Sequence, residues 1–460
     1  MTSRRVVRVV GLFVWVGAGS RGAGVEILGP EPPSVAQAEW LAHRDAPVAS
    51  SLVGDSGAPI PLAARAGGPC RTVFGYLPYW ESAANIRWDL LTHLACFSVE
   101  VRGDGTIGNT RGWPWTSTIN TAHVHGVKVI LVATLFDPAA IETLISSPIY
   151  TQAFLANIKA KMLQGQADGL NIDFEGSGAA WKSKVNAFMA QLTAYLHAEI
   201  PGCEVTFAGP AVNWRNEWDL AGLAASCDGI FIMGYAFAGS WSKNTGPNSP
   251  LTGGSINITN TITVQYAPVT QQHPEKLILG VPYYGGHWKT VSDQPRAAVT
   301  AWVGSTRFRD DEPNSRIYGV LWDTVSQTPW YRWFDGLDWH QVWYDNARSL
   351  GLKYALAEQY NLAGVGMWAL NYDGARPELW DELDRHFGAG CDVPADLDDD
   401  HDVDVTDFGL FQACYNGPGL PPAYGGCLAA DFDGDGDVDV ADFAAFQACF
   451  NGVDVIPACR

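Results

Sequence analysis

The stretch ADGLNIDFEG, residues 167–176, alternates polar and apolar positions. Asn171, Asp173 and Glu175 stand at every second position, with apolar residues between them. An alternation of period two is typical of a β-strand, whose successive side chains point to opposite faces. Three hydrogen-bonding groups on one face are costly to bury unless that face lines a wet cleft or takes part in chemistry. The stretch therefore predicts a strand whose carboxyl end carries an acidic functional pair.

Seven further strand-like runs accompany this one between Arg71 and Phe387, and several of the eight are separated by helix-like segments. The eight runs are 72–80, 91–101, 128–136, 169–175, 204–212, 229–237, 276–285 and 364–372. Eight β/α units in about 320 residues indicate an α/β fold, a closed (β/α)8 TIM barrel. A doubly wound sheet is the alternative that the strand count alone leaves open.

Aromatic residues cluster where these runs end, which is where a barrel carries its catalytic groups. An aromatic, acidic cleft suits a sugar polymer, because aromatic rings stack on the apolar faces of pyranose rings. A purely structural cap on the barrel is the alternative for any one of them. The residues at these ends are Tyr79, Trp80, Asp173, Glu175, Tyr235, Tyr283, Tyr284 and Trp368.

The sequence DGLNIDFE (168–175) resembles the D-G-x-D-x-D-x-E signature of family 18 glycoside hydrolases, the chitinase-like enzymes. Three further segments resemble the sixth, seventh and eighth strands of that family: MGY (233–235), LGVPYYG (279–285) and GMWALNYDG (366–374). WYDNARS (343–349) resembles a segment of the spore-coat-type and di-N-acetylchitobiase-like branches. The resemblance covers about residues 71–387.

The resemblance implies a secreted retaining hydrolase of glycans that contain β-1,4-linked N-acetylglucosamine, namely chitin, its oligomers or peptidoglycan. It implies substrate-assisted catalysis without a cofactor. Glu175 would be the general acid and then base, Asp173 the partner of the substrate acetamide, and Tyr235 a donor to the acetamide oxygen. The substrate-binding residues would be Asn171, Trp368, Tyr79, Tyr283 and Tyr284. Two carboxyl groups two residues apart on a strand lie about 6–7 Å apart along the backbone, and their repulsion can raise the pKa of one of them.

Two positions depart from the family pattern. Asn171 replaces the middle Asp of the signature and cannot exchange a proton, so the pH profile should differ from that of members with Asp. Ala236 stands where Asp or Glu commonly follows the tyrosine, which removes a polar contact near the sugar. Two alternatives follow: a buried acidic pair that only stabilises the barrel, and a non-catalytic, lectin-like barrel that binds amino sugars. Asp168, beside Gly169, is expected to be a hydrogen-bonding anchor rather than a catalyst.

The last 70 residues are acidic and duplicated. From Cys391 onward there are 15 Asp and only Arg460 as a cation, and residues 395–417 match residues 430–452 at a period of 35. Each repeat places Asp at positions 1, 3, 5, 7, 9 and 12, the pattern of a Ca²⁺ loop. The candidate ligands are Asp396, Asp398, Asp400, Asp402, Asp404 and Asp407, then Asp431, Asp433, Asp435, Asp437, Asp439 and Asp442.

Asp at position 12 and the duplicated loop and helix are similar to dockerin type I modules. This resemblance implies a small all-α module that binds two Ca²⁺ ions, with a cohesin-like protein as a partner; a disordered acidic tail is the alternative. Without metal, repulsion among the Asp residues should leave the module largely unfolded. The expected organisation is an export signal and leader at 1–38, a linker at 39–69, the hydrolase domain at 70–390 and the dockerin-like module at 391–460.

The N-terminus has a basic start and an apolar run from about Val9 to Ala18, which fits a bacterial-type export signal and an extracellular protein. Small residues near 19–23 and Ala36-Gln37-Ala38 are candidate cleavage sites. Nothing in the composition indicates a phosphate-binding surface, so nucleic acid is excluded as a partner.

Nine cysteines in an exported chain permit disulfides, and an odd count leaves at least one thiol unpaired. The predicted pairs are Cys414–Cys427 and Cys449–Cys459, with Cys70–Cys391 and Cys203–Cys227 as further candidates. Cys96, within an apolar strand, is the expected free thiol.

Overall fold

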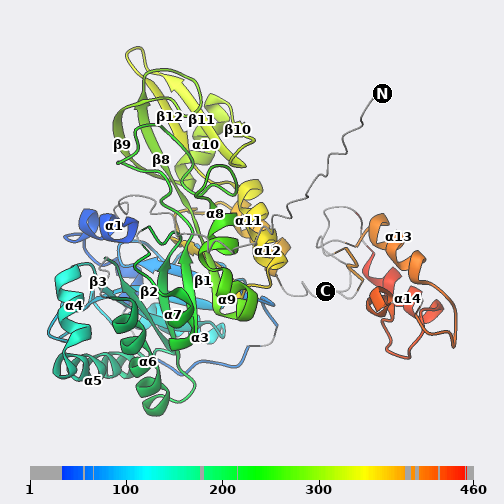
Figure 1. Ribbon diagram of the computed structural model, residues 1–460, viewed down its shortest axis with the longest axis horizontal. Helices are drawn as coiled ribbons and strands as arrows, with labels where there is room; N and C mark the ends of the chain where they lie inside the picture. Colours follow the sequence, from blue (N-terminus) through cyan, green and yellow to red (C-terminus); the bar gives the residue numbers. More distant parts are fainter. Residues whose placement is uncertain are drawn as a thin grey trace, which may run out of the picture.

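The structure is a computed structural model that describes residues 34–54, 57–65, 67–176, 181–214, 216–388, 395–398, 403–422, 425–450 and 452. Its centre is a closed barrel of eight parallel strands (Figure 1), in the order β1-β13-β7-β6-β5-β4-β3-β2. The strands are β1 (Thr72–Pro78), β2 (His93–Glu100), β3 (Lys128–Leu135), β4 (Gly169–Phe174), β5 (Glu204–Pro210), β6 (Gly229–Met233), β7 (Leu277–Pro282) and β13 (Gly364–Trp368). Closure confirms the (β/α)8 prediction and excludes the doubly wound sheet.

Helices and short turns connect the strands on the outside of the barrel. They are α3 (Thr116–Val124), α4 (Pro138–Ser146), α5 (Pro148–Gly165), α6 (Trp181–Glu199), α7 (Leu220–Ser226), α8 (Ile258–Asn260), η1 (Thr261–Gln265), α9 (Ala267–Gln272), η2 (Pro274–Lys276), α11 (Ala347–Gln359) and α12 (Glu378–Phe387). Within the described ranges, no helix is both long and apolar enough to cross a membrane.

Aromatic side chains fill the interior of the barrel. The ring of Phe231 lies 4.8 Å from that of Tyr76 and 5.5 Å from that of Phe74. The Phe231 ring of β6 fits only because Gly280 on β7 and Gly366 on β13 have no side chain. A Cβ at either glycine would lie 2.4 Å from the ring. The interior is therefore a packed core, and the cleft must lie above it at the carboxyl ends of the strands.

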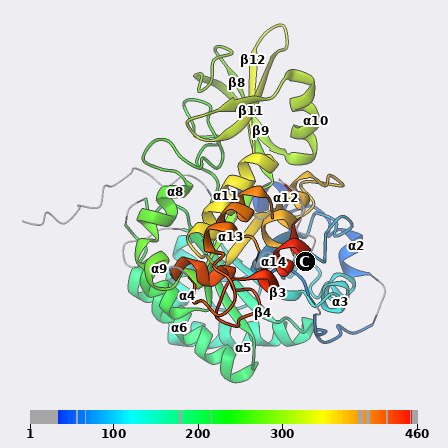
Figure 2. The same ribbon diagram turned by 90° about the vertical axis from the view of Figure 1, so that its right-hand side faces the viewer.

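A second sheet is inserted between β7 and β13, and the sequence analysis did not predict it. Figures 1 and 2 both place it beyond the carboxyl-terminal end of the barrel. Its strands are antiparallel, in the order β10-β11-β12-β8-β9, and helix α10 (Phe308–Tyr318) packs with them. The strands are β8 (Tyr284–Thr290), β9 (Val299–Arg307), β10 (Leu321–Asp323), β11 (Thr328–Phe334) and β12 (Trp339–Trp343).

The segment WYDNARS, by which the sequence resembled particular branches of the family, has a structural role here. Asp345 and Lys353 form a fully buried ion pair with a 2.5 Å Oδ1–Nζ distance. The Ser349 hydroxyl also donates to Asp345 Oδ1, at 2.7 Å, and Asn346 caps α11. These contacts anchor the start of α11 beside the inserted sheet.

Residues before the barrel form ordered structure. Helix α1 (Val35–His43) begins at the capping residue Ser34, and α2 (Ser50–Val53) follows it. Ala36 and Leu52 belong to the main hydrophobic core. The predicted linker 39–69 thus includes most of α1 and all of α2, and α1 also contains residues assigned to the leader. Residues 1–33 of that leader lie outside the described residues.

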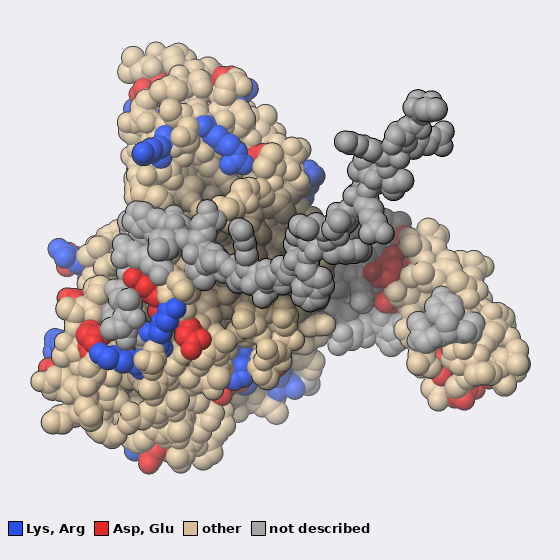
Figure 3. Space-filling model, in the orientation of Figure 1, with Lys and Arg blue, Asp and Glu red and all other residues tan. Residues whose placement is uncertain are grey.

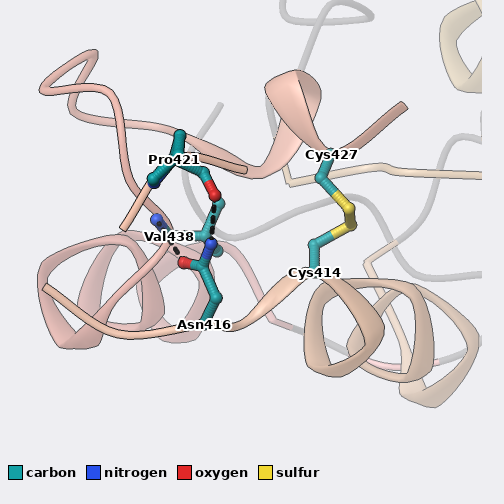
Figure 4. The surroundings of a disulfide bond; sticks show 5 residues. All are labelled: Cys414, Asn416, Pro421, Cys427 and Val438. Atoms are coloured by element: carbon teal, nitrogen blue, oxygen red, sulfur yellow. Dashed lines mark hydrogen bonds between the residues drawn. A yellow bond between two sulfur atoms is a disulfide. The ribbon is translucent and has the colours of Figure 1, made fainter. Parts of the chain in front are cut away.

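The C-terminal module contains α13 (Val405–Cys414), the short helix η3 (Gly425–Ala430) and α14 (Val440–Cys449). It has its own small core, in which Phe411 and Phe446 stack at 5.5 Å. The disulfide Cys414–Cys427 joins α13 to η3, which confirms that prediction (Figure 4). Asn416, shown in the same figure, donates to Pro421 O and accepts from Val438 N, so it connects the first repeat to the second.

The remaining cysteines divide into two groups. Cys70 and Cys449 are disulfide-bonded, while their predicted partners, Cys391 and Cys459, lie outside the described residues. Cys96 is a buried free thiol, as predicted. The Cys203–Cys227 prediction is wrong, because both are buried free thiols. The Cys227 thiol, directly after α7, instead contacts the carbonyl oxygen of Leu223 in that helix, at 3.2 Å.

Candidate active site

Strand β4 carries the acidic pair at the end of the barrel interior. Asn171 is fully buried and Asp173 is 2% exposed, whereas Glu175 is half-buried just beyond the end of the strand. The Glu175 amide still donates to Leu135 O at 3.2 Å, which continues the pairing with β3. At the opposite end of the strand, Asp168 accepts hydrogen bonds from Val129 N (2.7 Å) and contacts His123 Nε2 (2.9 Å). Asp168 is thus an anchor, as expected.

Asn171 is held by two partners beneath the acidic pair. The Tyr76 hydroxyl donates to Asn171 Oδ1 at 2.8 Å, and Asn171 Nδ2 donates to Thr206 Oγ1 at 2.9 Å. All three side chains are buried. Since an amide carries no charge, the floor beneath Asp173 stays neutral at every pH.

Asp173 holds a proton more tightly than an ordinary aspartate. Burial raises its pKa well above the usual value, and the charge of Glu175 and a hydrogen bond with it raise it further. The pKa of Tyr235 is also raised, first by burial and then by Tyr76, Tyr284, Asp173 and Glu175. The Tyr235 hydroxyl therefore remains a hydrogen-bond donor beside the acidic pair.

Aromatic rings form the floor and one wall of the site. The Trp368 ring lies 5.6 Å from that of Tyr76 and 4.8 Å from that of Phe97. On the wall, Tyr235 and Tyr284 meet edge to face at 6.0 Å. Trp368 Nε1 and Asp173 Oδ1 are buried with no hydrogen-bond partner among the described residues. This buried donor and this buried acceptor could each form a hydrogen bond with a polar ligand at the floor of the site.

Two of the predicted binding residues lie away from the acidic pair. The Tyr79 ring is fully buried, and its hydroxyl donates to His43 O at 2.7 Å. Tyr283 is also fully buried. Burial raises the pKa of its hydroxyl, and the nearby Tyr354 and Asp373 raise it further. The structure thus brings Asn171, Asp173, Glu175, Tyr235, Tyr284 and Trp368 together.

The sequence analysis missed residues that position the site. Tyr76 lies in a run recognised as a strand, but nothing in that run sets it apart from the other apolar residues. Asn248 accepts from Ala236 N at 2.9 Å and donates to Tyr284 O at 3.1 Å. It therefore fixes the loop after β6, where Ala236 has a φ of 64°. Asn248 lies in a long irregular segment without periodicity, so no sequence signal indicated it.

An eight-stranded parallel barrel with carboxylates and aromatic rings at the carboxyl ends of its strands defines an enzyme-type site that suits carbohydrates. A family model described as "Glycosyl hydrolases family 18" matches residues 72–373. The chain therefore belongs to the family 18 glycosyl hydrolases, and it is chitinase-like.

Similar proteins agree with this assignment. Human di-N-acetylchitobiase is 30% identical over 303 residues, which are 57% of this chain and 74% of that protein. The Group IV chitinase of Ostrinia furnacalis, solved in complex with allosamidin, has a TM-score of 0.60 at 21% identity and covers 68% of this chain and 97% of its own. The chitinase-like agglutinin RobpsCRA from Robinia pseudoacacia has a TM-score of 0.60 at 20% identity, with coverages of 68% and 98%. These two structures share the fold.

In the described part of the C-terminal module, carboxylates gather into three groups. Within each group the ligand atoms lie within 4.8 Å of one another: Asp396, Asp398 and Asp407; Asp431, Asp433 and Asp435; and Asp437, Asp439 and Asp442. Asp404 caps α13, while Asp400 and Asp402 lie outside the described residues. Figure 3 shows acidic but no basic side chains on the visible face of the module.

Proposed function

We propose that the chain is a secreted retaining glycosidase that cleaves β-1,4-linked N-acetylglucosamine-containing glycans by substrate-assisted catalysis. The observation that carries this proposal is the juxtaposition of Asp173, whose pKa is raised, with Glu175 above an aromatic floor. Chitin, chitooligosaccharides and peptidoglycan share the acetamido group that the mechanism requires. The similarity to di-N-acetylchitobiase supports the oligosaccharides in particular.

In the first step, Glu175 protonates the glycosidic oxygen, and the acetamide carbonyl oxygen of the same sugar attacks the anomeric carbon. The bond to the leaving sugar breaks, and a cyclic oxazolinium ion forms. Asp173 accepts a hydrogen bond from the acetamide N–H, and the Tyr235 hydroxyl donates one to the acetamide oxygen. In the second step, Glu175 removes a proton from water, which attacks the anomeric carbon from the side of the departed sugar. The bond between the anomeric carbon and the acetamide oxygen breaks, and the acetamide is restored. The two inversions leave the configuration retained.

The residues are suited to these roles. Charge that develops on the acetamide is stabilised by donors and acceptors that are already fixed, which avoids reorganisation in the transition state. Trp368 would lie under the reacting sugar, with its Nε1 available to a sugar oxygen. Tyr284, in contact with Tyr235, would form the wall.

Turnover of a fluorogenic chitobioside tests the proposal, with proton NMR of the first-formed sugar anomer and product analysis on both chitin and peptidoglycan. We expect hydrolysis and an initial β-anomer. Binding of chitotriose without hydrolysis of any of these glycans would select the alternative, an amino-sugar-binding barrel. Ala236 favours that alternative, because it offers a ligand no polar side chain at this position.

Replacing Asn171 by Asp should move the alkaline limb of the pH profile of kcat/KM to higher pH by about one unit. A carboxylate beneath Asp173 would disfavour ionisation of the acidic pair, so deprotonation, and with it the loss of activity, would require a higher pH. Asn171→Leu is the control without charge, since it removes both hydrogen bonds of Asn171 and adds no carboxylate; it should lower the rate and leave the limb in place. If the alkaline limb of Asn171→Asp lies at the same pH as that of the wild type, this prediction is wrong.

We further propose that the C-terminal module is a dockerin-like unit that binds two Ca²⁺ ions. Clustered carboxylate oxygens are the ligands that this cation prefers. Two equivalent apolar residues, Val405 and Val440, are 67% and 65% exposed at the start of α13 and α14. They support a protein partner, for which we propose a cohesin-like domain. A calcium-dependent pull-down from the secretome of the source tests this, and recovery that is equal in EGTA would count against it.

We also propose that the basic and apolar segment within the leader 1–38 directs export, as its composition indicates. N-terminal sequencing of protein recovered from the culture medium tests this proposal. Its result also establishes how much of α1 the mature chain keeps.

A further inference from the structure

Helix α1 lies across the mouth of the site. In Figure 1 this first helix, in blue, lies at the level between the barrel strands and the inserted sheet. Its side chains contact residues that follow several different strands. The Trp40 indole donates to Glu100 Oε1 at 3.2 Å, and its ring lies 5.9 Å from that of Phe136. On another side, Glu39 Oε2 accepts from the Tyr372 hydroxyl at 3.1 Å.

The end of α1 is held as well. The His43 ring stacks on Trp80 at 4.3 Å and 6°, and its carbonyl accepts from Tyr79. Tyr79 and Trp80 are aromatic residues that the sequence placed at the mouth of the cleft, and both contact this segment. The helix therefore covers the Trp80 ring, an aromatic surface at the strand ends that would otherwise be open to a glycan.

The space left at the catalytic carboxylate is too small for a sugar. The cavity bordered by Glu175, Trp214 and Tyr235 has a volume of about 60 Å³, and Ser34 and Val35 form part of its lining. A pocket for a ligand of this kind usually has at least about 300 Å³. Two other cavities border α1, of about 470 Å³ beside Trp40 and about 110 Å³ beside Glu39. Helix α1 thus divides the groove into separate spaces.

We infer that the segment Ser34–His43 is an autoinhibitory strap, which must leave the cleft before a glycan can reach Glu175. The inference rests on the proposed function and concerns its regulation. A nine-residue helix is marginal in isolation, so its contacts with the barrel hold it in place. Its outer face is exposed at Leu41 and Ala42, and it adjoins an exposed Arg44. Of the strap residues, Ala36 belongs to the main core, and Val35 and Trp40 pack against it from outside. Detachment would therefore uncover these contacts and leave the barrel strands paired.

A strap that occupies the cleft lowers the apparent affinity for substrate, because substrate binds only those molecules whose strap has left the cleft. In the full chain, Trp40→Ala should lower the KM for a fluorogenic chitobioside about tenfold with little change in kcat. Leu41→Ala is the matched control on the exposed face of the same helix and should behave as wild type. An unchanged or higher KM in Trp40→Ala would overturn the inference while leaving the proposed function intact.

A second measurement does not depend on Trp40→Ala folding. In the full chain carrying Glu175→Gln, saturating chitotriose should accelerate amide hydrogen exchange across 35–43 and leave exchange in β4 unchanged. Bound sugar with unchanged or slower exchange in α1 would show that α1 stays in place over the ligand, and would refute the strap. If no variant binds or hydrolyses any amino sugar, the proposed function itself fails, and the regulation proposed for it fails with it.

Discussion

Replacing Glu175 by Gln should lower kcat on a fluorogenic chitobioside by about 10³-fold. Glutamine keeps the shape of the side chain but has no proton to give to the glycosidic oxygen, so the leaving group would depart as an anion. The same group is needed again to activate water, and both steps are therefore slowed. Stopped assays over hours, with enzyme concentrations scaled to the expected loss, would measure the residual rate.

Binding and stability separate this effect from damage to the fold. Since the substitution removes one of two neighbouring carboxyl groups, thermal stability should be maintained, and chitotriose should still bind. Glu199→Gln, at a partly exposed ion pair with Lys159, is the control and should retain full activity. Residual activity above a tenth of wild type in Glu175→Gln would remove this residue from the role of general acid.

Chelation of calcium should unfold the C-terminal module and leave the barrel intact. Asp431, Asp433 and Asp435 lie close enough to share one cation. The pKa of Asp433 is raised, first by desolvation and then by the charges of Asp435, Asp442 and Asp431. Without a cation, this repulsion opposes the folded loop, and the small core of the module offers little to offset it. Metal binding and folding should therefore be one coupled process.

Hydrogen exchange measured by mass spectrometry would resolve the two parts of the chain. In EGTA, amides of α13 and α14 should exchange completely within seconds, while those of β4 and β6 remain protected. Asp433→Ala should weaken calcium binding at least about tenfold, because a ligand oxygen is lost from the loop. Asp45→Ala, at a carboxylate whose side chain is 92% exposed, should have no effect. Helices that stay protected in EGTA would refute the coupling.

The sequence predicted the barrel because most of its strands are nearly continuous apolar runs, as expected for parallel strands covered on both faces. It also predicted the acidic pair, since polar residues at every second position of β4 have no structural purpose in a core. The inserted sheet escaped prediction for the opposite reason. Every residue of its strand β9 is exposed or half-exposed, and Gly, Ser and Thr interrupt the alternation that would mark it.

Neighbouring aromatic residues at a strand end show a second limit of sequence reasoning. Tyr283 and Tyr284 are equally plausible in the sequence, yet only Tyr284 contacts Tyr235, because adjacent side chains point to opposite sides. The place of α1 could not be predicted either. Its residues carry no strong apolar periodicity, and their position depends on contacts with strand ends far along the chain.

The inserted sheet delays completion of the barrel during synthesis. Strand β13 pairs with both β1 and β7, so it fills the last gap in the ring of strands. Until the ribosome has released Gly364 and the residues after it, β1 and β7 each present an unpaired edge, and such edges favour aggregation. Shortened versions of this protein made for the laboratory should therefore include all of β13, since a stop before Trp368 leaves the ring open, and should end after Phe387, where α12 ends.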